Sequence, residues 1–166
     1  MATITLKGNE VHTLGALPEV GNKAPDFILV DTDLSEKKLS DYKGKVVILN
    51  IFPSLDTETC AMSVREFNEK VSDMENTVVL CISKDLPFAQ KRFCAAEGLD
   101  NVIPLSAFRS NFGKEYNLEF SDGPLKGLFS RSVIVLNVSG EIIYKEQVAE
   151  TTNEPNYEKV MAAILK

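Results

Sequence analysis

Three cysteines and one histidine are the side chains of this chain best suited to act as nucleophiles or metal ligands. They are Cys60, Cys81, Cys94 and His12. The cysteines are too few for the disulfide framework of a small secreted protein, and no two of them form a C-x-x-C pair. His12 is distant from them along the chain, so no zinc-type spacing arises, and we read it as a surface strand residue. This cysteine usage favours a reducing compartment, where thiols are kept for reactivity or packing.

Cys60 follows a buried strand and precedes a helical pattern. Residues 46–52 form an apolar run that stops at Pro53, which cannot donate to a sheet ladder. Apolar residues at spacings of three and four begin at Ala61. The first turn of a helix offers unpaired N–H groups and a positive dipole end, and both favour the nucleophilic thiolate. On placement alone, a small apolar residue on a buried helix face is an equally good interpretation of Cys60.

The other two cysteines have different surroundings. Cys81 lies inside the apolar segment 78–82, so we expect burial on both faces of its strand, a raised thiol pKa and a structural role. Cys94 follows Lys91 and Arg92, which would favour a thiolate, but it lies near a helix C-terminus, where the dipole opposes one. The sequence around Cys94 therefore supports either interpretation.

Length and composition limit the function classes. The 166 residues predict one domain, 1–166, large enough to bury a core without disulfides. The net charge is −6 and the chain has no long Lys/Arg cluster, which argues against nucleic acid and anionic membranes as partners. The N-terminus has no apolar signal region, and no apolar run approaches the length of a membrane span. We therefore expect a soluble cytoplasmic protein.

The expected elements predict an α/β protein with a thioredoxin-like fold. Strands at 45–52 and 77–83 are separated by a helix from Cys60 to about Glu75, and such a crossover implies parallel pairing. The other expected elements are an N-terminal hairpin extension (1–16) turning at Gly8 and Asn9, strands at 27–30, 102–105, 132–138 and 141–148, and helices at 86–97, 110–116 and 155–165. Pro104 suggests an edge position or a strand end for 102–105. A mixed central sheet flanked by helices satisfies this order.

Two enzyme classes that use a cysteine at a helix start fit poorly. A C-x5-R phosphatase loop is excluded because Arg65 gives C-x4-R, with no glycine between it and Cys60. A dithiol oxidoreductase needs a second cysteine close by. Its place is held by Thr57, whose hydroxyl can bind a small polar ligand beside the sulfur.

The spacing Pro53-x-x-x-Thr57-x-x-Cys60 resembles the P-x-x-x-T/S-x-x-C motif of peroxiredoxins. The wider likeness covers essentially the whole chain and is to the bacterial thiol peroxidase subfamily, the atypical two-cysteine peroxiredoxins. It is carried by residues 50–57, 77–83, 85–90, 92–94, 96–99 and 122–128.

This resemblance implies a role for five residues. Cys60 matches the peroxidatic cysteine, which becomes a sulfenic acid, and Cys94 matches the resolving cysteine, which forms an intramolecular disulfide with it. Thr57 matches the hydroxyl that orients the peroxide, and Pro53 shields the sulfur from water. Arg131 matches the arginine that stabilises the thiolate and the charge developing on oxygen; without the resemblance it would be read as a surface charge at a strand edge.

The resemblance also implies an activity and partners. It implies an antioxidant oxidoreductase, a peroxidase that reduces alkyl or lipid hydroperoxides and hydrogen peroxide without metal or other cofactor. It further implies reduction by thioredoxin, a homodimer, and a Cys81 that turnover does not need. Because a disulfide requires Cα atoms about 4.4–6.8 Å apart, we expect an end of one cysteine-bearing helix to unwind. A non-catalytic thioredoxin-like module and a general protein thiol–disulfide oxidoreductase remain open as alternatives.

Overall fold

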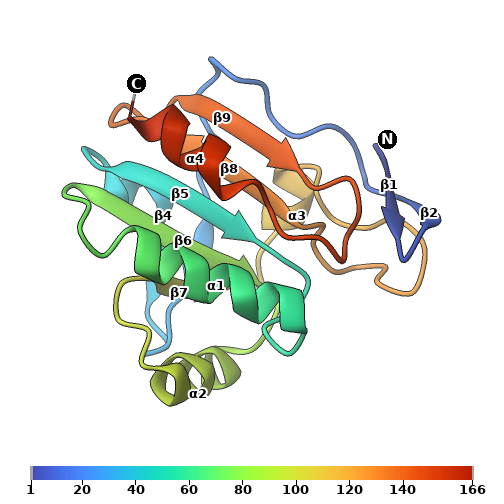
Figure 1. Ribbon diagram of the computed structural model, residues 1–166, viewed down its shortest axis with the longest axis horizontal. Helices are drawn as coiled ribbons and strands as arrows, with labels where there is room; N and C mark the ends of the chain where they lie inside the picture. The colour runs from blue at the N-terminus through green and yellow to red at the C-terminus, as the bar shows by residue number, and fades with distance from the viewer. Residues whose placement is uncertain (1, 166) are drawn as a thin grey trace.

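The computed structural model describes residues 2–165 and contains two β-sheets, a seven-stranded mixed sheet and a separate hairpin (Figure 1). The strands are β1 (Thr3–Leu6), β2 (Asn9–His12), β3 (Ile28–Val30), β4 (Glu36–Lys38), β5 (Val46–Ile51), β6 (Thr77–Ser83), β7 (Ile103–Ser106), β8 (Ser132–Leu136) and β9 (Ile142–Gln147). The helices are α1 (Glu58–Lys70), α2 (Pro87–Glu97), α3 (Phe112–Glu115) and α4 (Tyr157–Ile164), with a 3₁₀ turn η1 (Leu39–Tyr42). The large sheet has the order β4-β3-β7-β6-β5-β8-β9.

The centre of the large sheet is parallel, as the sequence predicts. β5 pairs with β6 in parallel from Val46 opposite Thr77 to Ile51 opposite Ile82, and β6 pairs in parallel with β7. Strands buried on both faces read as continuous apolar runs, which is how β5 and β6 appear in the sequence. Their carboxyl ends meet at one edge of the sheet, where the chain enters α1 and α2 (Figure 1).

Two apolar layers cover the sheet. One contains Leu49 and Leu80 with Phe112 of α3, and η1 packs against it. The other contains Val64 of α1 and Val160 of α4. Figure 1 shows α1 and α4 lying over the same face of the sheet. The helices therefore flank the sheet on both sides, and α1 is fixed against its centre.

The structure changes three details of the predicted elements. α1 ends at Lys70 rather than near Glu75, because the chain turns after Val71 and passes through Asn76 at φ +56° before entering β6. The N-terminal hairpin turns at Lys7 and Gly8, one residue earlier than predicted. β8 and β9 are joined by a longer connection than the predicted two residues, because Leu136 pairs with Ile142.

The edge position suggested for the strand containing Pro104 is wrong. β7 lies between β3 and β6 in the sheet. Proline is tolerated there because β3 pairs with β7 only at Val30 and Ser106, beyond the proline. Pro104 is also the second residue of its strand, in agreement with the alternative suggestion of a strand end.

Within residues 2–165, no helix combines the length and apolar character that crossing a membrane would require.

Candidate active site

Cys60 lies in the first turn of α1, as predicted, and its side chain is fully buried (0% exposed). The helix begins after Thr57, which has extended backbone angles (φ −99°, ψ 143°). The Thr57 hydroxyl does not cap the helix but donates to the carbonyl of Ser54 at 3.0 Å. The N–H groups of the first turn thus receive no side-chain acceptor from Thr57, and they remain available to the sulfur or to a ligand beside it.

Arg131 is brought to Cys60 by the pairing of two strands. It directly precedes β8, and Ser132 pairs with Ile51 at the end of the antiparallel neighbour β5. The start of β8 therefore lies beside the turn that leads into α1. Arg131 Nη1 donates to the sulfur of Cys60 at 3.3 Å, and Nε donates to the carbonyl of Thr151 at 3.0 Å.

The burial of Arg131 makes this contact chemically informative. Its side chain is 2% exposed, so the interpretation as a surface charge is wrong. A guanidinium keeps its charge in proteins, and a buried charge is costly unless an opposite charge or strong acceptors accompany it. Among residues 2–165, Arg65 pairs with Glu97 and Arg109 with Glu36, and Arg92 is exposed to solvent. Arg131 forms no ion pair with a carboxylate although it is buried. A thiolate at Cys60 would provide the missing negative charge.

A groove with a volume of about 490 Å³ lies above this pair. Pro53, Thr57 and Arg131 line it, so these predicted site residues meet in one place. The remaining lining residues come from the N-terminal hairpin, the 122–128 loop and the chain beside α1: Leu6, Lys7, Asn9, Val11, Pro124, Leu125, Thr59, Thr151 and Thr152. Cys60 does not line the groove, whereas Thr57 before it in the chain and Arg131 in contact with its sulfur do.

Glu150 attaches the hairpin to the segment that holds Arg131. Its carboxylate accepts hydrogen bonds from the N–H of Gly8 at 2.8 Å and from the hydroxyl of Thr5 at 2.9 Å. It also accepts from the N–H and hydroxyl of Thr152 at 2.8 Å. The backbone hydrogen bonds from Thr152 and Gly8 are the main reason why the pKa of Glu150 falls to about 2. The hairpin is therefore fixed one residue away from Thr151, the acceptor of the Arg131 Nε–H.

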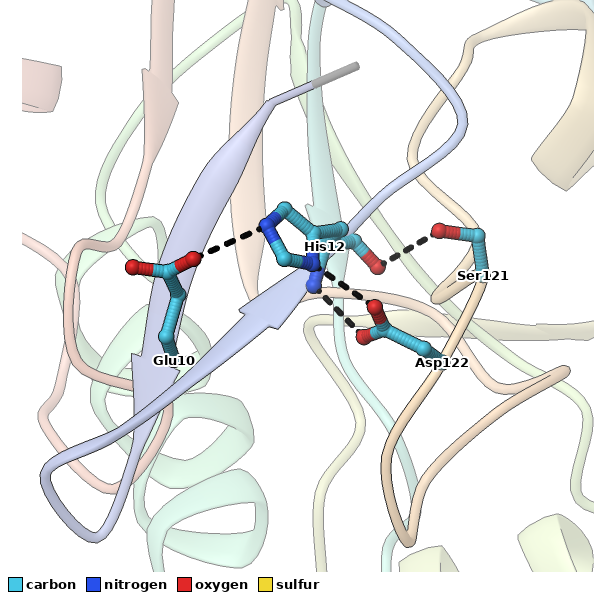
Figure 2. Close-up of polar contacts among 4 residues, drawn as sticks. All are labelled: Glu10, His12, Ser121 and Asp122. Carbon is cyan, nitrogen blue, oxygen red and sulfur yellow. Dashed lines mark hydrogen bonds and ion pairs between the residues drawn. The ribbon is translucent and has the colours of Figure 1, made fainter.

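His12 attaches the same hairpin to the 122–128 loop. Figure 2 shows its imidazole between two carboxylates, with Nδ1 2.7 Å from Asp122 and Nε2 3.1 Å from Glu10. The hydrogen bond to Asp122 is the main cause that raises the pKa of His12 above 6.5. The backbone N–H of His12 donates to Asp122, and the hydroxyl of Ser121 donates to the His12 carbonyl. These contacts hold together two sides of the groove.

The remaining cysteines lie outside the groove. Cys81 is 1% exposed, and burial raises the pKa of its thiol far above the usual range, as expected for a structural position. Cys94 is partly buried on α2, and burial together with the charge of Asp100 raises its pKa to about 11. The neighbouring Lys91 and Arg92 are exposed and do not offset this rise. None of the three cysteines forms a disulfide, and Cys94 packs against the apolar cluster that contains Cys60.

Sequence reasoning missed two parts of the site. Thr151 carries no motif, because its carbonyl matters only once the fold places it beside Arg131. The hairpin was read as an extension, yet Leu6 and Val11 line the groove. The 122–128 loop had a visible sign, a glycine and a proline at positions 123 and 124, and it is one of the segments that carry the family resemblance.

Residues 19–161 match the Redoxin family model. The chain belongs to the redoxin family. The thiol peroxidases of Mycobacterium bovis and Corynebacterium glutamicum are each 51% identical to this redoxin over 164 residues, which cover 99% of both chains. These matches confirm the resemblance to the bacterial thiol peroxidases and the prediction that the protein is a peroxidase of the peroxiredoxin class.

Solved structures agree with the fold. The peroxiredoxin-like protein from Aquifex aeolicus has a TM-score of 0.94 to this redoxin at 38% identity, covering 99% of this chain and 96% of that one. The thiol peroxidase from Chromobacterium violaceum has a TM-score of 0.90 at 21% identity, covering 98% and 95%. The predicted thioredoxin-like α/β fold, with a mixed sheet and a separate N-terminal hairpin, is confirmed.

Proposed function

We propose that this protein is a thiol peroxidase in which Cys60 reduces hydroperoxides and Cys94 resolves the product. The observation that carries the proposal is the 3.3 Å contact between Cys60 and Arg131, a buried guanidinium without a carboxylate partner in residues 2–165. A cationic donor beside a buried sulfur stabilises the thiolate, which is the nucleophile that peroxide cleavage requires.

In the first step, the Cys60 thiolate attacks the terminal oxygen of ROOH. A sulfur–oxygen bond forms, the O–O bond breaks, and RO⁻ leaves and takes a proton to become the alcohol. The sulfur is oxidised to a sulfenic acid and the peroxide is reduced. Arg131 donates N–H groups toward the charge that develops on the leaving oxygen, and the Thr57 hydroxyl orients the peroxide. Pro53, buried beside the groove, keeps water from the sulfur.

In the second step, the Cys94 thiol loses its proton and attacks the sulfenic sulfur of Cys60. The sulfur–sulfur bond forms, the sulfur–oxygen bond breaks, and hydroxide leaves and takes up a proton to become water. A dithiol, for which the resemblance implies thioredoxin, then returns both cysteines to thiols and becomes a disulfide itself. Cys60 and Cys94 lie on separate helices, so an end of one helix unwinds for their sulfurs to meet. We assign this unwinding to the second half of α2, because the buried residues of that helix, Pro87 and Gln90, both lie nearer its start.

The groove suits hydroperoxides that carry an apolar chain. Leu6, Val11 and Leu125 line it and can bury an alkyl group, which favours alkyl or lipid hydroperoxides, with hydrogen peroxide as a smaller substrate. A homodimer, a cytoplasmic location and a part in antioxidant defence belong to the same proposal, and the likeness to the thiol peroxidases supports them.

The test is steady-state kinetics with hydrogen peroxide, tert-butyl hydroperoxide and a fatty-acid hydroperoxide, with thioredoxin and its reductase as the electron source. We expect Cys60→Ser to lower turnover by a factor on the order of 10⁴ or more, because the nucleophile is gone. Cys94→Ser should complete one oxidation and then hold Cys60 as a sulfenic acid open to over-oxidation. Cys81→Ser is the matched control and should turn over normally.

Other outcomes would support other functions. A non-catalytic module would consume no peroxide, and a general thiol–disulfide oxidoreductase would reduce a protein disulfide without peroxide. If Cys81→Ser stops turnover while Cys94→Ser does not, the assignment of the resolving cysteine is wrong.

A further inference from the structure

The carboxylate of Asp85 fastens the turn before α1 to the end of β6. Asp85 is partly buried in the link between β6 and α2. Ser54 Oγ donates to Oδ1 at 2.8 Å, and the N–H of Leu55 donates to Oδ2 at 2.8 Å. The hydroxyl of Ser83, the last residue of β6, donates to Oδ2 at 2.6 Å. Hydrogen bonds to an ionised carboxylate are roughly twice as strong as neutral ones, so this is a firm attachment.

On the α1 side, the attachment reaches the peroxide-binding hydroxyl through one residue. The carbonyl of Ser54 accepts from the hydroxyl of Thr57 at 3.0 Å and from the Thr57 N–H at 3.2 Å. Ser54 Oγ also accepts from the N–H of Asp56 at 3.2 Å. The orientation of Ser54 therefore sets both the direction of the Thr57 side chain and the point where α1 begins.

On the α2 side, the attachment reaches a buried glutamine. Gln90 is 0% exposed, and its Nε2 donates to Ser83 Oγ at 3.3 Å and to the carbonyl of Leu105 at 3.0 Å. Ser83 thus donates to Asp85 and accepts from Gln90, which uses its hydroxyl in both directions. The network ends at Gln90, whose Oε1 is buried without a hydrogen-bond partner among residues 2–165, so its rigid part is the hydrogen-bonded carboxylate of Asp85. Cys94 lies beyond Gln90 on the same helix.

We propose that Asp85 is a positioning residue of the peroxidase reaction. Its hydrogen bond with Ser54 fixes the positions of the Thr57 hydroxyl and the start of α1 relative to the peroxide. Its hydrogen bond with Ser83, which accepts from Gln90, connects this region to the first part of α2. The proposal rests on the proposed function, because its effect is on the oxidation of Cys60. Since the part of α2 that carries Cys94 lies outside the network, Asp85 acts on oxidation and leaves disulfide formation unaffected.

The experiment measures the two steps separately in Asp85→Asn. The amide keeps one acceptor oxygen but presents an NH₂ group where the other carboxylate oxygen accepted hydrogen bonds. We expect the second-order rate constant for oxidation of Cys60 by cumene hydroperoxide to fall by about 10²-fold, and the rate constant for disulfide formation to change by less than about twofold. Dimedone trapping and mass spectrometry on quenched samples distinguish the sulfenic acid from the disulfide.

Two further variants sharpen the result. Ser54→Ala removes only the hydrogen bond from the Ser54 hydroxyl to Asp85 and should slow the oxidation of Cys60 by about tenfold. The double variant with Asp85→Asn should be oxidised only slightly more slowly than Asp85→Asn alone, because the effects of substitutions within one network are not additive. Asp33→Asn is the matched control. Asp33 accepts from the N–H of Ser35 at 2.9 Å and from its hydroxyl at 2.5 Å in an exposed turn, so both rate constants should stay unchanged.

The outcomes separate this proposal from the one on which it rests. If hydroperoxide does not oxidise Cys60 in the unaltered protein, both proposals fail. If it does, and Asp85→Asn is oxidised equally fast, only the positioning role is wrong. A parallel loss of oxidation, disulfide formation and Tm would mean that Asp85 only supports the fold, and would also overturn the proposal. If Asp85→Asn does not fold, the same comparison of rate constants in Ser54→Ala decides.

Discussion

The first turn of α1 and the second half of α2 each present a cysteine, and their surroundings are opposites. Cys60 is fully buried, contacts a guanidinium, and begins a helix with buried residues along its length, from Cys60 to Phe67. Cys94 lies on a helix that is mostly exposed beyond Gln90, and Gly98 ends it in a left-handed turn at φ +66°.

The different surroundings of Cys60 and Cys94 correspond to different requirements of peroxide cleavage and disulfide formation. Peroxide cleavage gains from donors that are fixed before the substrate arrives, because they cost no reorganisation during the reaction. Disulfide formation requires a sulfur that can leave its place, and segments with few buried contacts open most readily. One sulfur therefore lies in a fully buried part of the fold and the other on a helix segment with few buried residues.

Apart from the loss of Cys60 itself, the largest effect should come from removing the charge beside it. Arg131→Met keeps much of the side-chain volume but deletes the donor to sulfur, so we expect the rate constant for Cys60 oxidation to fall by about 10²–10³-fold. Stopped-flow competition for peroxide measures it. Arg109→Met removes an exposed arginine that pairs with Glu36 and should have no effect. Equal rates in the two variants would show that the guanidinium does not assist the reaction.

The next effect concerns the protonation of Cys94. In a Cys60→Ser/Cys81→Ser protein, only Cys94 remains to react with iodoacetamide. Its pKa is raised to about 11 in the folded protein from an ordinary value of 9.0, so the neutral thiol persists to higher pH. At pH 8 the native protein should be alkylated about 10²-fold more slowly than the denatured protein, because only the thiolate reacts. Similar rates in both states would mean that α2 does not protect this sulfur.

A smaller effect tests whether α2 unwinds for resolution. Ala95→Gly, at an exposed position of α2, should destabilise the helix by about 1 kcal/mol and raise the rate constant for disulfide formation about fivefold. Ala162→Gly is the same change at an exposed position of α4 and should leave that rate constant unchanged. A slower disulfide step in Ala95→Gly would indicate that the intact helix, rather than its unwound form, presents Cys94.

The smallest effect concerns the hairpin that lines the groove. His12 faces Glu10 on its own hairpin and Asp122 on the neighbouring loop, where Lys126 also interacts with Asp122. The pKa of His12 is raised in the folded protein. Its contribution to the stability of the hairpin is therefore complete below pH 6.5 and is lost as pH rises through the raised pKa.

Amide hydrogen exchange of residues 3–12, corrected for its intrinsic pH dependence, should therefore show about twofold weaker protection at pH 9 than at pH 6. His12→Gln should abolish the difference. If the variant keeps the same pH dependence, another group is responsible.

The elements of this protein that depend on local pattern could be predicted from its amino-acid order. Continuous apolar runs identified β5 and β6, because both faces of these strands are buried. Apolar residues at spacings of three and four after Cys60 identified α1, because one face of this helix is buried. Proline at the start and glycine after the end fixed α2. The motif from Pro53 to Cys60 pointed to a peroxidase, since the Thr57 hydroxyl lies three residues before the cysteine that we propose as the nucleophile.

The residues that surround that motif became known from the fold. Arg131 could be read as a surface charge until the pairing of β8 with β5 placed it, buried, against Cys60. Asp85 and the hairpin carried no sign of their contacts with the site, because those contacts join segments far apart in the chain. Local patterns arise from the burial of neighbouring residues, whereas electrostatics and access at a site depend on which distant segments the sheet order brings together.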